Sequence, residues 1–327
     1  MYNYLSMIKN VVLFNDHGIG DLIWSRHIVN YISPHLQKQN ISLSFNHKYN
    51  KSILNFNENI TLGSYRDCIS FISPINEQNM YPIHCPHASI TYENFVFINT
   101  WLLFSNSYLS ELRNLNNPEN NSENMSVNLV NFDILALLTN DIINIIEKKC
   151  NISIPKATGN LLFPHCNKNL CKVDQIDRFF ENQKFSNYVL VSNGDSRSGQ
   201  TENFNVYEWL EPVIQMYPDC GFIFTEKILK TNYKNVITTS NFPARQSLDN
   251  IEYMSTKCKV LFTRSSGPGH IFFNRDNCFD SSKTIIAYTK HKNTAFLYEK
   301  GTCNYIWSNI FTQENLVENF KNVLSEI

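Results

Sequence analysis

A pattern of buried strand, glycine turn and helix near the start of the chain constrains the fold more than any other feature. Residues 11–14 form an apolar run with the length of a buried strand, and Gly18 and Gly20 stand in the turn that follows. Apolar side chains then recur with helical spacing through residues 22–32, and Asp21 stands where this helix begins. This order predicts a βα unit whose loop lies at the carboxyl edge of a parallel sheet, where open α/β folds bind ligands.

Strand and helix patterns alternate along the rest of the chain. In the first half we predict strands at residues 41–45, 68–72 and 95–98, and helices at 51–56 and 132–149. In the second half we predict strands at residues 188–192, 221–225, 235–239, 259–263 and 284–288, and helices at 173–180, 206–216, 248–257 and 313–324. Such alternation is typical of parallel sheets covered by helices on both faces.

An irregular segment at residues 150–170, which contains two prolines and a glycine, separates the two halves. The length of 327 residues suits two domains of about 150 residues each. We therefore expect an α/β protein with two Rossmann-like domains, residues 1–155 and 156–327, whose parallel sheets face each other across a cleft. The last helix could pack back on the first domain.

The composition is that of a folded protein, with 43% hydrophobic and 17% charged residues. A net charge of −1 argues against a nucleic-acid partner, which would require a basic face. Nine cysteines without regular spacing are typical of a reduced, cytoplasmic chain. The most apolar stretch, residues 95–104, is shorter than the roughly 20 residues that span a membrane. We therefore expect no transmembrane segment, while peripheral contact with the inner face of a membrane stays open.

A second glycine-bearing motif begins at Arg264, directly after the predicted strand at residues 259–263. The hydroxyls of Ser265 and Ser266 and the free backbone N–H groups of a helix start favour binding of an anion. Pro268 suits the first turn of a helix, where its missing N–H costs nothing. The alternative interpretation is a capped turn without a ligand, with Ser266 as the cap.

A polar loop at residues 193–200 follows the first predicted strand of the second half. Asn193, the hydroxyls of the loop and the guanidinium of Arg197 are groups that suit a phosphate. A solvated surface loop is the alternative. Because this loop and the motif at Arg264 leave strands of the same predicted domain at their carboxyl ends, together they predict a diphosphate site.

Other residue patterns argue against a dinucleotide-binding site and against a metal site. The position three residues after Gly20 is Ile23, which departs from the dinucleotide-binding fingerprint. Two groups of metal-ligand types, His84–Cys85–His87 and His165–Cys166–Cys171, lack the paired cysteine spacing of zinc sites, so we predict no metal and no cofactor.

Asn99 and Trp101 follow the predicted strand at residues 95–98, and we place them on the acceptor side of the predicted cleft. Asp21 could equally do no more than support the helix N-terminus, where a carboxylate is favourable.

With these motifs in order, the chain resembles the two-domain GT-B glycosyltransferases and, among them, the bacterial heptosyltransferase family (glycosyltransferase family 9). The likeness rests on three segments: the turn at residues 18–21, the strand, loop and helix at 188–209, and the turn at 266–270. One position departs from the family, which commonly has an aspartate where this chain has Ser265. The donor sugar therefore does not follow from the resemblance.

The resemblance implies that Asp21 is the general base and that Arg197 contacts the donor phosphates. It also implies that Ser266, Gly267 and His270 bind the donor. Gly18, Gly20, Asn193, Arg264 and Ser265 complete the predicted donor and phosphate site.

The function implied by the resemblance is sugar transfer from a nucleotide-diphosphate sugar to a glycan or glycolipid acceptor, by an inverting, metal-independent displacement. The implied setting is the synthesis of cell-surface polysaccharides. Two other readings remain open. The chain could be a nucleotide-sugar 2-epimerase, which acts on the nucleotide sugar alone, or a non-catalytic protein that binds a nucleotide sugar with the same fold.

Overall fold

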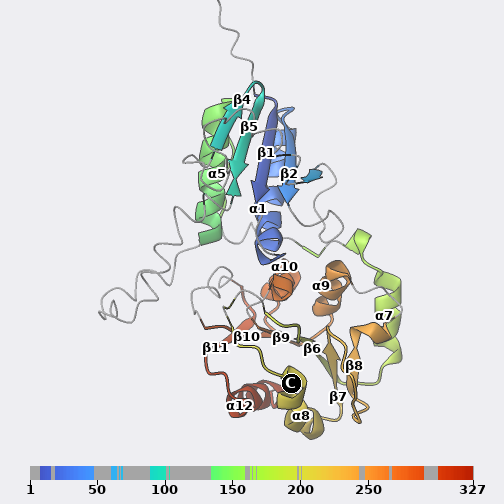
Figure 1. Ribbon diagram of the computed structural model, residues 1–327. Helices are drawn as coiled ribbons and strands as arrows, with labels where there is room; N and C mark the ends of the chain where they lie inside the picture. The colour runs from blue at the N-terminus through green and yellow to red at the C-terminus, as the bar shows by residue number, and fades with distance from the viewer. Residues whose placement is uncertain are drawn as a thin grey trace, which may run out of the picture. The chain divides into compact units, whose positions relative to one another are not determined.

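The computed structural model describes residues 8–15, 19–47, 60–64, 66, 68, 89–100, 103, 134–158, 163, 165–166, 168–196, 199, 201–242, 247–264, 267–290 and 301–326. The chain divides into two compact units, Met1–Leu162 and Phe163–Ile327. Each unit contains its own sheet with helices packed on it, as Figure 1 shows. This confirms the predicted α/β class and the presence of two parallel-sheet units.

The sheet of the first unit has the strand order β3-β2-β1-β5-β4. Its strands are β1 (Asn10–Asn15), β2 (Ser42–His47), β3 (Thr61–Ser64), β4 (Ser89–Tyr92) and β5 (Phe95–Asn99). All neighbours pair in parallel except β4, which runs antiparallel to β5 at one edge. The strands predicted at residues 11–14, 41–45 and 95–98 are confirmed, whereas β3 and β4 were not predicted.

Two predictions in this unit meet a different outcome. Cys68, predicted to begin a strand, has helical backbone instead, and residues 69–72 lie outside the described residues. The helix predicted at residues 51–56 also lies outside them.

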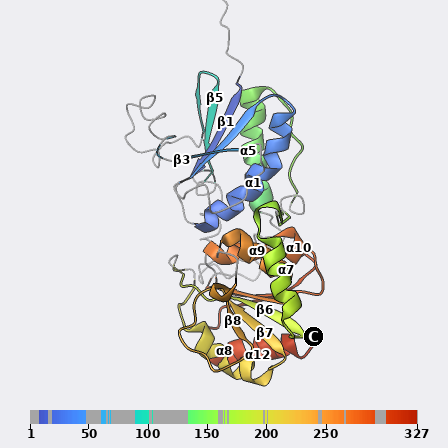
Figure 2. The same ribbon diagram turned by 90° about the vertical axis from the view of Figure 1, so that its right-hand side faces the viewer.

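Helices α1 (Ile19–Gln37) and α5 (Ile134–Cys150) cover one face of the first sheet and lie side by side, as Figure 2 shows. Both follow from apolar residues at helical spacing, because those residues are the ones that are buried. Ile28 and Ile32 of α1 and Ile142 and Ile146 of α5 are fully inaccessible to solvent. The predicted helix at residues 132–149 is thereby confirmed as α5.

Residues 155–157 are attached to the first unit by side chains of α1 and α5. The Tyr31 hydroxyl lies within hydrogen-bonding distance of the carbonyls of Pro155 and Lys156, at 3.2 and 3.3 Å, and shares its one proton between them. The Asn140 side chain exchanges two hydrogen bonds with the backbone of Ala157, at 2.7 and 3.0 Å. Residues 155–157 therefore belong to the first compact unit, Met1–Leu162. Such side-chain contacts leave no periodic pattern in the sequence.

The second unit contains a fully parallel sheet with the order β11-β10-β9-β6-β7-β8. Its strands are β6 (Asn187–Ser192), β7 (Cys220–Phe224), β8 (Val236–Thr238), β9 (Val260–Arg264), β10 (Thr284–Tyr288) and β11 (Asn304–Ser308). Strands β6, β7, β9 and β10 each contain a run of buried apolar residues, and helices cover both faces of the sheet. All five strands predicted for this half are confirmed, and β11 is an additional edge strand.

Helices cover both faces of the second sheet, as Figures 1 and 2 show. On one face lie α8 (Val206–Met216) and α12 (Gln313–Leu324); on the other lie α7 (Val173–Asn182), α9 (Leu248–Thr256) and α10 (Arg275–Cys278). The described residues of this unit also include the short 3₁₀ helices η6 (Lys168–Leu170), η7 (Thr239–Asn241) and η8 (Gly267–Phe272). Among the described residues, no helix has the length and apolar character that crossing a membrane requires.

The last helix, α12, packs against α8 within the second unit. Leu316 and Phe320 are fully buried in the same apolar cluster as Leu210 of α8. The return of the last helix to the first domain stays a prediction. The apolar stripe of α12 is satisfied by its own sheet and by α8.

Polar caps fix where three helices of the second unit begin. The side chains of Asn205, Ser247 and Thr312 each accept a hydrogen bond from a backbone N–H in the first turn of α8, α9 and α12, respectively. Such caps satisfy N–H groups that have no partner inside the helix. The loop after β6 therefore ends at Asn205, next to the candidate site.

Candidate functional site

The strand order of the second sheet reverses direction between β6 and β9. Such a switch point leaves a crevice outside the carboxyl ends of the strands, where open α/β sheets bind ligands. Ser192 of β6 pairs with Thr263 of β9, so Asn193 and Arg264 occupy equivalent positions at this edge. The two polar loops, predicted to leave strands of one domain at their carboxyl ends, thus leave strands that are also neighbours in the sheet.

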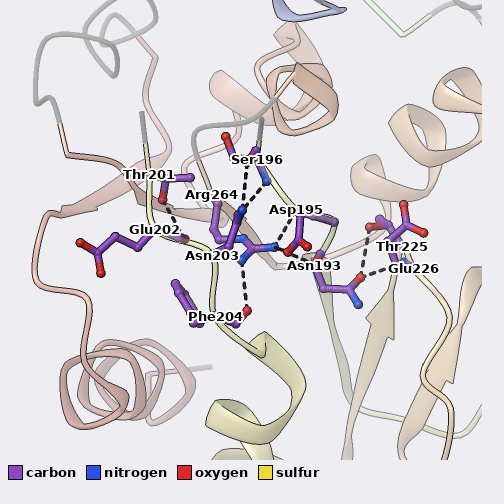
Figure 3. Close-up of polar contacts among 11 residues, drawn as sticks. Asn193, Asp195, Ser196, Thr201, Glu202, Asn203, Phe204, Thr225, Glu226 and Arg264 are labelled. Carbon is purple, nitrogen blue, oxygen red and sulfur yellow. Dashed lines mark hydrogen bonds and ion pairs between the residues drawn. The ribbon is translucent and has the colours of Figure 1, made fainter. Parts of the chain in front are cut away.

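Arg264 links these two strands from a fully buried position, with a side-chain exposure of 0%. One Nη atom donates hydrogen bonds to the carbonyls of Asn193 and Gly194 at 2.9 and 2.6 Å, and the other donates to the carbonyl of Phe204 at 3.1 Å. The Asp195 carboxylate lies 3.3 Å from the guanidinium. Burial lowers the pKa of Arg264 from its usual value, and Asp195 opposes that shift. Figure 3 shows the guanidinium enclosed by this loop.

The loop at residues 193–204 is held by two further side chains (Figure 3). Asn203 accepts a hydrogen bond from the Ser196 N–H at 2.8 Å and donates one to the Ser196 carbonyl at 3.0 Å. Asn193 accepts a hydrogen bond from the Glu226 N–H at 2.8 Å, which ties the loop to the end of β7. At its tip, Gly199 has a φ of 71°, a left-handed conformation that favours glycine. Arg197 lies outside the described residues.

The segment after β9 continues as the 3₁₀ helix η8, whereas the sequence predicted a turn into an ordinary helix. Gly267 belongs to η8, and Ser265 and Ser266 lie outside the described residues. A side chain at Gly269 would place its Cβ 1.7 Å from the Thr263 hydroxyl. Glycine is therefore required for η8 to approach β9 this closely.

His270 is the predicted donor-binding residue of η8. Burial lowers the pKa of its imidazole to about 4. The ring is therefore neutral at pH 7 and can donate one hydrogen bond and accept another. A neutral ring adds no positive charge for a phosphate, so electrostatic stabilisation of a diphosphate must come from other groups.

Lys290 is a residue of this edge that the sequence analysis missed. It follows β10, and its ammonium lies 3.6 Å from the carboxylate of Glu202 in the loop after β6. Both side chains remain accessible, with exposures of 43% and 55%, as does Asp195 at 77%. In the sequence, Lys290 stands two residues beyond a predicted strand. It can be assigned to this edge only when β10 is known to lie beside β9. The described part of this edge therefore presents both a cation and carboxylates.

The first sheet has an equivalent switch point between β1 and β5. Phe14 pairs with Asn99, so the ends of the two strands are level. The Asn15 side chain donates hydrogen bonds to the hydroxyls of Ser25 in α1 and Thr100 after β5, at 3.0 and 2.9 Å. These bonds fasten the start of α1 to the carboxyl edge of the sheet.

Asp21 is the third residue of α1 and so lies in its first turn, where the helix dipole favours a carboxylate. Gly20 belongs to the same turn. This turn follows β1, and Asn99 is the last residue of β5, which pairs with β1 in parallel. The side chain of Asp21, and all of Gly18 and Trp101, lie outside the described residues.

The metal-ligand types at His165 and Cys166 contact α10 in the structure. Asp276 of α10 lies 3.2 Å from the His165 ring and accepts a hydrogen bond from the Cys166 N–H at 2.7 Å. These contacts fasten the segment to α10. Within the part of the chain that the structure describes, no group of three or more His, Cys, Asp or Glu side chains could hold a metal ion. His84, Cys85 and His87 lie outside that part.

Comparison with known proteins reveals similarity at the level of the fold. No protein-family model and no curated protein sequence matches the chain. The crystal structure of the glycosyl transferase family 9 from Veillonella parvula DSM 2008 matches with a TM-score of 0.53 and 10% identity, over 99% of each chain. The E. coli heptosyltransferase WaaC with ADP-2-deoxy-2-fluoro heptose matches with a TM-score of 0.53 and 11% identity, over 97% of this chain and 99% of WaaC. At such low identity, these matches confirm the predicted GT-B-type α/β fold.

Proposed function

We propose that this chain is a glycosyltransferase that moves a sugar from a nucleotide-diphosphate sugar to a glycan or glycolipid acceptor. The observation that carries this proposal is the fold match to a family 9 glycosyltransferase and to WaaC over nearly the whole length of each chain. The meeting of two predicted donor loops at the switch point of the second sheet adds support. A cytoplasmic location, with at most peripheral contact with the membrane, is the setting expected from the sequence.

The donor is proposed to bind at the carboxyl edge of β6 and β9. Here Arg197, Ser265, Ser266 and the start of η8 would hold the diphosphate, and Lys290 supplies a positive charge at the same edge. The exposed carboxylate of Asp195 suits hydroxyl groups, because a carboxylate is a hydrogen-bond acceptor. A ribose or the transferred sugar offers such hydroxyls.

The reaction we propose is a single displacement with inversion at the anomeric carbon. The acceptor hydroxyl oxygen attacks that carbon, the bond to the diphosphate oxygen breaks, and Asp21 takes the acceptor proton. An unperturbed Asp has a pKa near 3.9 and is therefore a weak base at neutral pH. The proton must therefore pass to Asp21 late in the displacement, as the nucleoside diphosphate departs. Asp21 belongs to the first unit and the donor loops belong to the second, so each unit contributes to a different half of the reaction.

A second candidate is non-catalytic binding of a nucleotide sugar. It is favoured by Ser265, which stands where the resembling family commonly has an aspartate. If the protein is instead catalytic, Ser265 in place of the aspartate changes its preference for the donor sugar. A 2-epimerase remains a third reading, because it would use the same donor edge without an acceptor.

The proposal is tested first by a thermal-shift screen of nucleoside diphosphates and nucleotide sugars. A ligand at 100 times its Kd stabilises the folded state by about 2.7 kcal/mol, so at least one of these compounds should raise the Tm. The binding nucleotide sugar is then followed by NMR with and without a panel of saccharide acceptors. Transfer that depends on an acceptor supports the proposal, whereas a change of the sugar without acceptor indicates an epimerase. Binding without any turnover indicates the non-catalytic reading, and the absence of any shift at millimolar concentration contradicts all three.

A further inference from the structure

We propose that Arg264 is a positioning residue that holds the loop at residues 193–204 in the conformation the donor site needs. This inference rests on the proposed function and assigns Arg264 a different role from the direct phosphate contact expected from the sequence. The guanidinium is fully buried, and it donates three hydrogen bonds to backbone carbonyls and one to the Asp195 carboxylate.

The hydrogen bonds of Arg264 clamp both ends of the loop. Asn193 and Gly194, whose carbonyls accept from one Nη atom, begin the loop, and Phe204, whose carbonyl accepts from the other, ends it. A single side chain from β9 thus fixes where the loop leaves β6 and where it enters α8. Fixing the loop before binding lowers the entropy cost of ordering it around a ligand.

Ring stacking adds a second attachment at the end of the loop. The Arg264 guanidinium lies 5.2 Å from the centre of the Phe204 ring, and Phe204 stacks on Trp209 of α8 with ring centres 4.0 Å apart. A planar guanidinium can bond to several carbonyls and stack on an aromatic ring at the same time, whereas the compact ammonium of lysine cannot. We therefore expect lysine to replace arginine at this position only in part.

Asp195 connects this clamp to the accessible side of the loop. Its carboxylate lies 3.3 Å from the buried guanidinium, while 77% of its side chain remains exposed. Arg264 therefore orients a carboxylate that faces outward at the switch point. Loss of the guanidinium would release both the backbone of the loop and this carboxylate.

Lys283 offers a matched control, because it is a second buried cation in the same unit. Its exposure is 4%, and its ammonium donates hydrogen bonds to the carbonyls of Ser255, Thr256 and Cys258 at 2.9, 2.8 and 2.9 Å. These acceptors lie at the end of α9 and the residues after it, outside the two candidate loops. Arg264→Met and Lys283→Met therefore each leave several buried carbonyls without a charged donor, but only the first releases the donor loop.

The test measures two properties of Arg264→Met, Arg264→Lys and Lys283→Met at a temperature well below each Tm. The first is hydrogen–deuterium exchange of the peptide at residues 193–204 without ligand. The second is the Kd of the nucleoside diphosphate that shifts the wild-type Tm. We expect Arg264→Met to speed exchange of this peptide and to raise the Kd about tenfold or more. Arg264→Lys should restore part of both effects, and Lys283→Met should change neither by more than about twofold.

The inference is overturned if the peptide at residues 193–204 exchanges at the wild-type rate in Arg264→Met. It is also overturned if Lys283→Met changes both measurements as much as Arg264→Met does. If Arg264→Met does not fold, Arg264→Lys against Lys283→Met supplies the same comparison. If the wild-type protein binds no nucleoside diphosphate, the proposed function fails. The exchange measurement on the unliganded protein then still decides whether Arg264 clamps the loop.

Discussion

Asn15, the last residue of strand β1, donates a hydrogen bond to the hydroxyl of Thr100 beyond the end of strand β5, at 2.9 Å. Both side chains are almost completely buried, with exposures of 2% each. This contact joins the carboxyl ends of the two strands at the switch point of the first sheet. It supports the turn of α1 that carries Asp21, because Asn15 also bonds to Ser25 of α1.

Removal of the Thr100 hydroxyl should destabilise this edge. Thr100→Val keeps the shape of the side chain but deprives the buried Asn15 amide of one acceptor, and we expect a loss of about 1–3 kcal/mol in the free energy of unfolding. Urea denaturation of Thr100→Val and wild type measures this loss in the free energy of unfolding. Thr139→Val is the control, because that buried hydroxyl bonds to the carbonyl of Leu135 within its own helix and its loss should cost less. Equal stability of Thr100→Val and wild type would refute this role.

Titration of His270 should make the protein less stable in acid. Its pKa is about 4 in the folded chain, against 6.5 ordinarily, so between these values the unfolded chain binds a proton that the folded chain does not. Stability should therefore fall as the pH drops from 6.5 towards 4, by at most about 3 kcal/mol. Urea denaturation at pH 7 and pH 4.5 should show a smaller difference for His270→Asn than for wild type. The same pH dependence in both proteins would contradict this assignment.

Helix α12 should be essential to the core of the second unit. Phe320 is fully buried and lies 5.8 Å from the ring of Phe262 in β9, so Phe320→Ala should cost about 3–5 kcal/mol in unfolding free energy. Asn322→Ala, at an exposed position of the same helix, should change it by less than about 0.5 kcal/mol. Chemical denaturation of the two variants provides the comparison. A small loss for Phe320→Ala would mean that α12 does not complete this core.

Substitution of Asp21 tests the proposed base. Asp21→Asn should lower the rate of sugar transfer by about 10²–10⁴-fold, because general-base catalysis is lost, while the Kd of the nucleotide stays within about twofold of wild type. Asp174→Asn is a matched control, since Asp174 also lies in the first turn of a helix and is exposed. Steady-state transfer assays and nucleotide titrations measure the two quantities. Wild-type turnover by Asp21→Asn would remove Asp21 from the mechanism.

The fold could be predicted from the sequence where helices cover a strand on both faces. β6 and β9 each contain a run of consecutive buried apolar residues, which is typical of a central parallel strand. The strands that escaped prediction lie at sheet edges, where one neighbour is missing and burial is partial. β3 has four residues with little apolar content, and β4 reverses into β5 through a turn in which Glu93 takes a φ of 50° without a glycine signal.

The candidate site could be predicted as a set of loops but not as a set of side-chain roles. The order of strands and loops placed Asn193 and Arg264 at one edge, because parallel strands end together. The direction of the Arg264 side chain depends on the carbonyls around it, and those belong to a loop distant in sequence. Lys290 could not be predicted as part of this edge, because its position depends on which strand lies beside β9.

The most direct measurement of the central claim is hydrogen–deuterium exchange of the wild-type protein with and without the nucleoside diphosphate that binds most tightly. We predict slower exchange on binding in the peptides at residues 193–204 and 264–272, which flank the switch point of the second sheet. Binding that leaves the exchange of both peptides unchanged would contradict a donor site between β6 and β9.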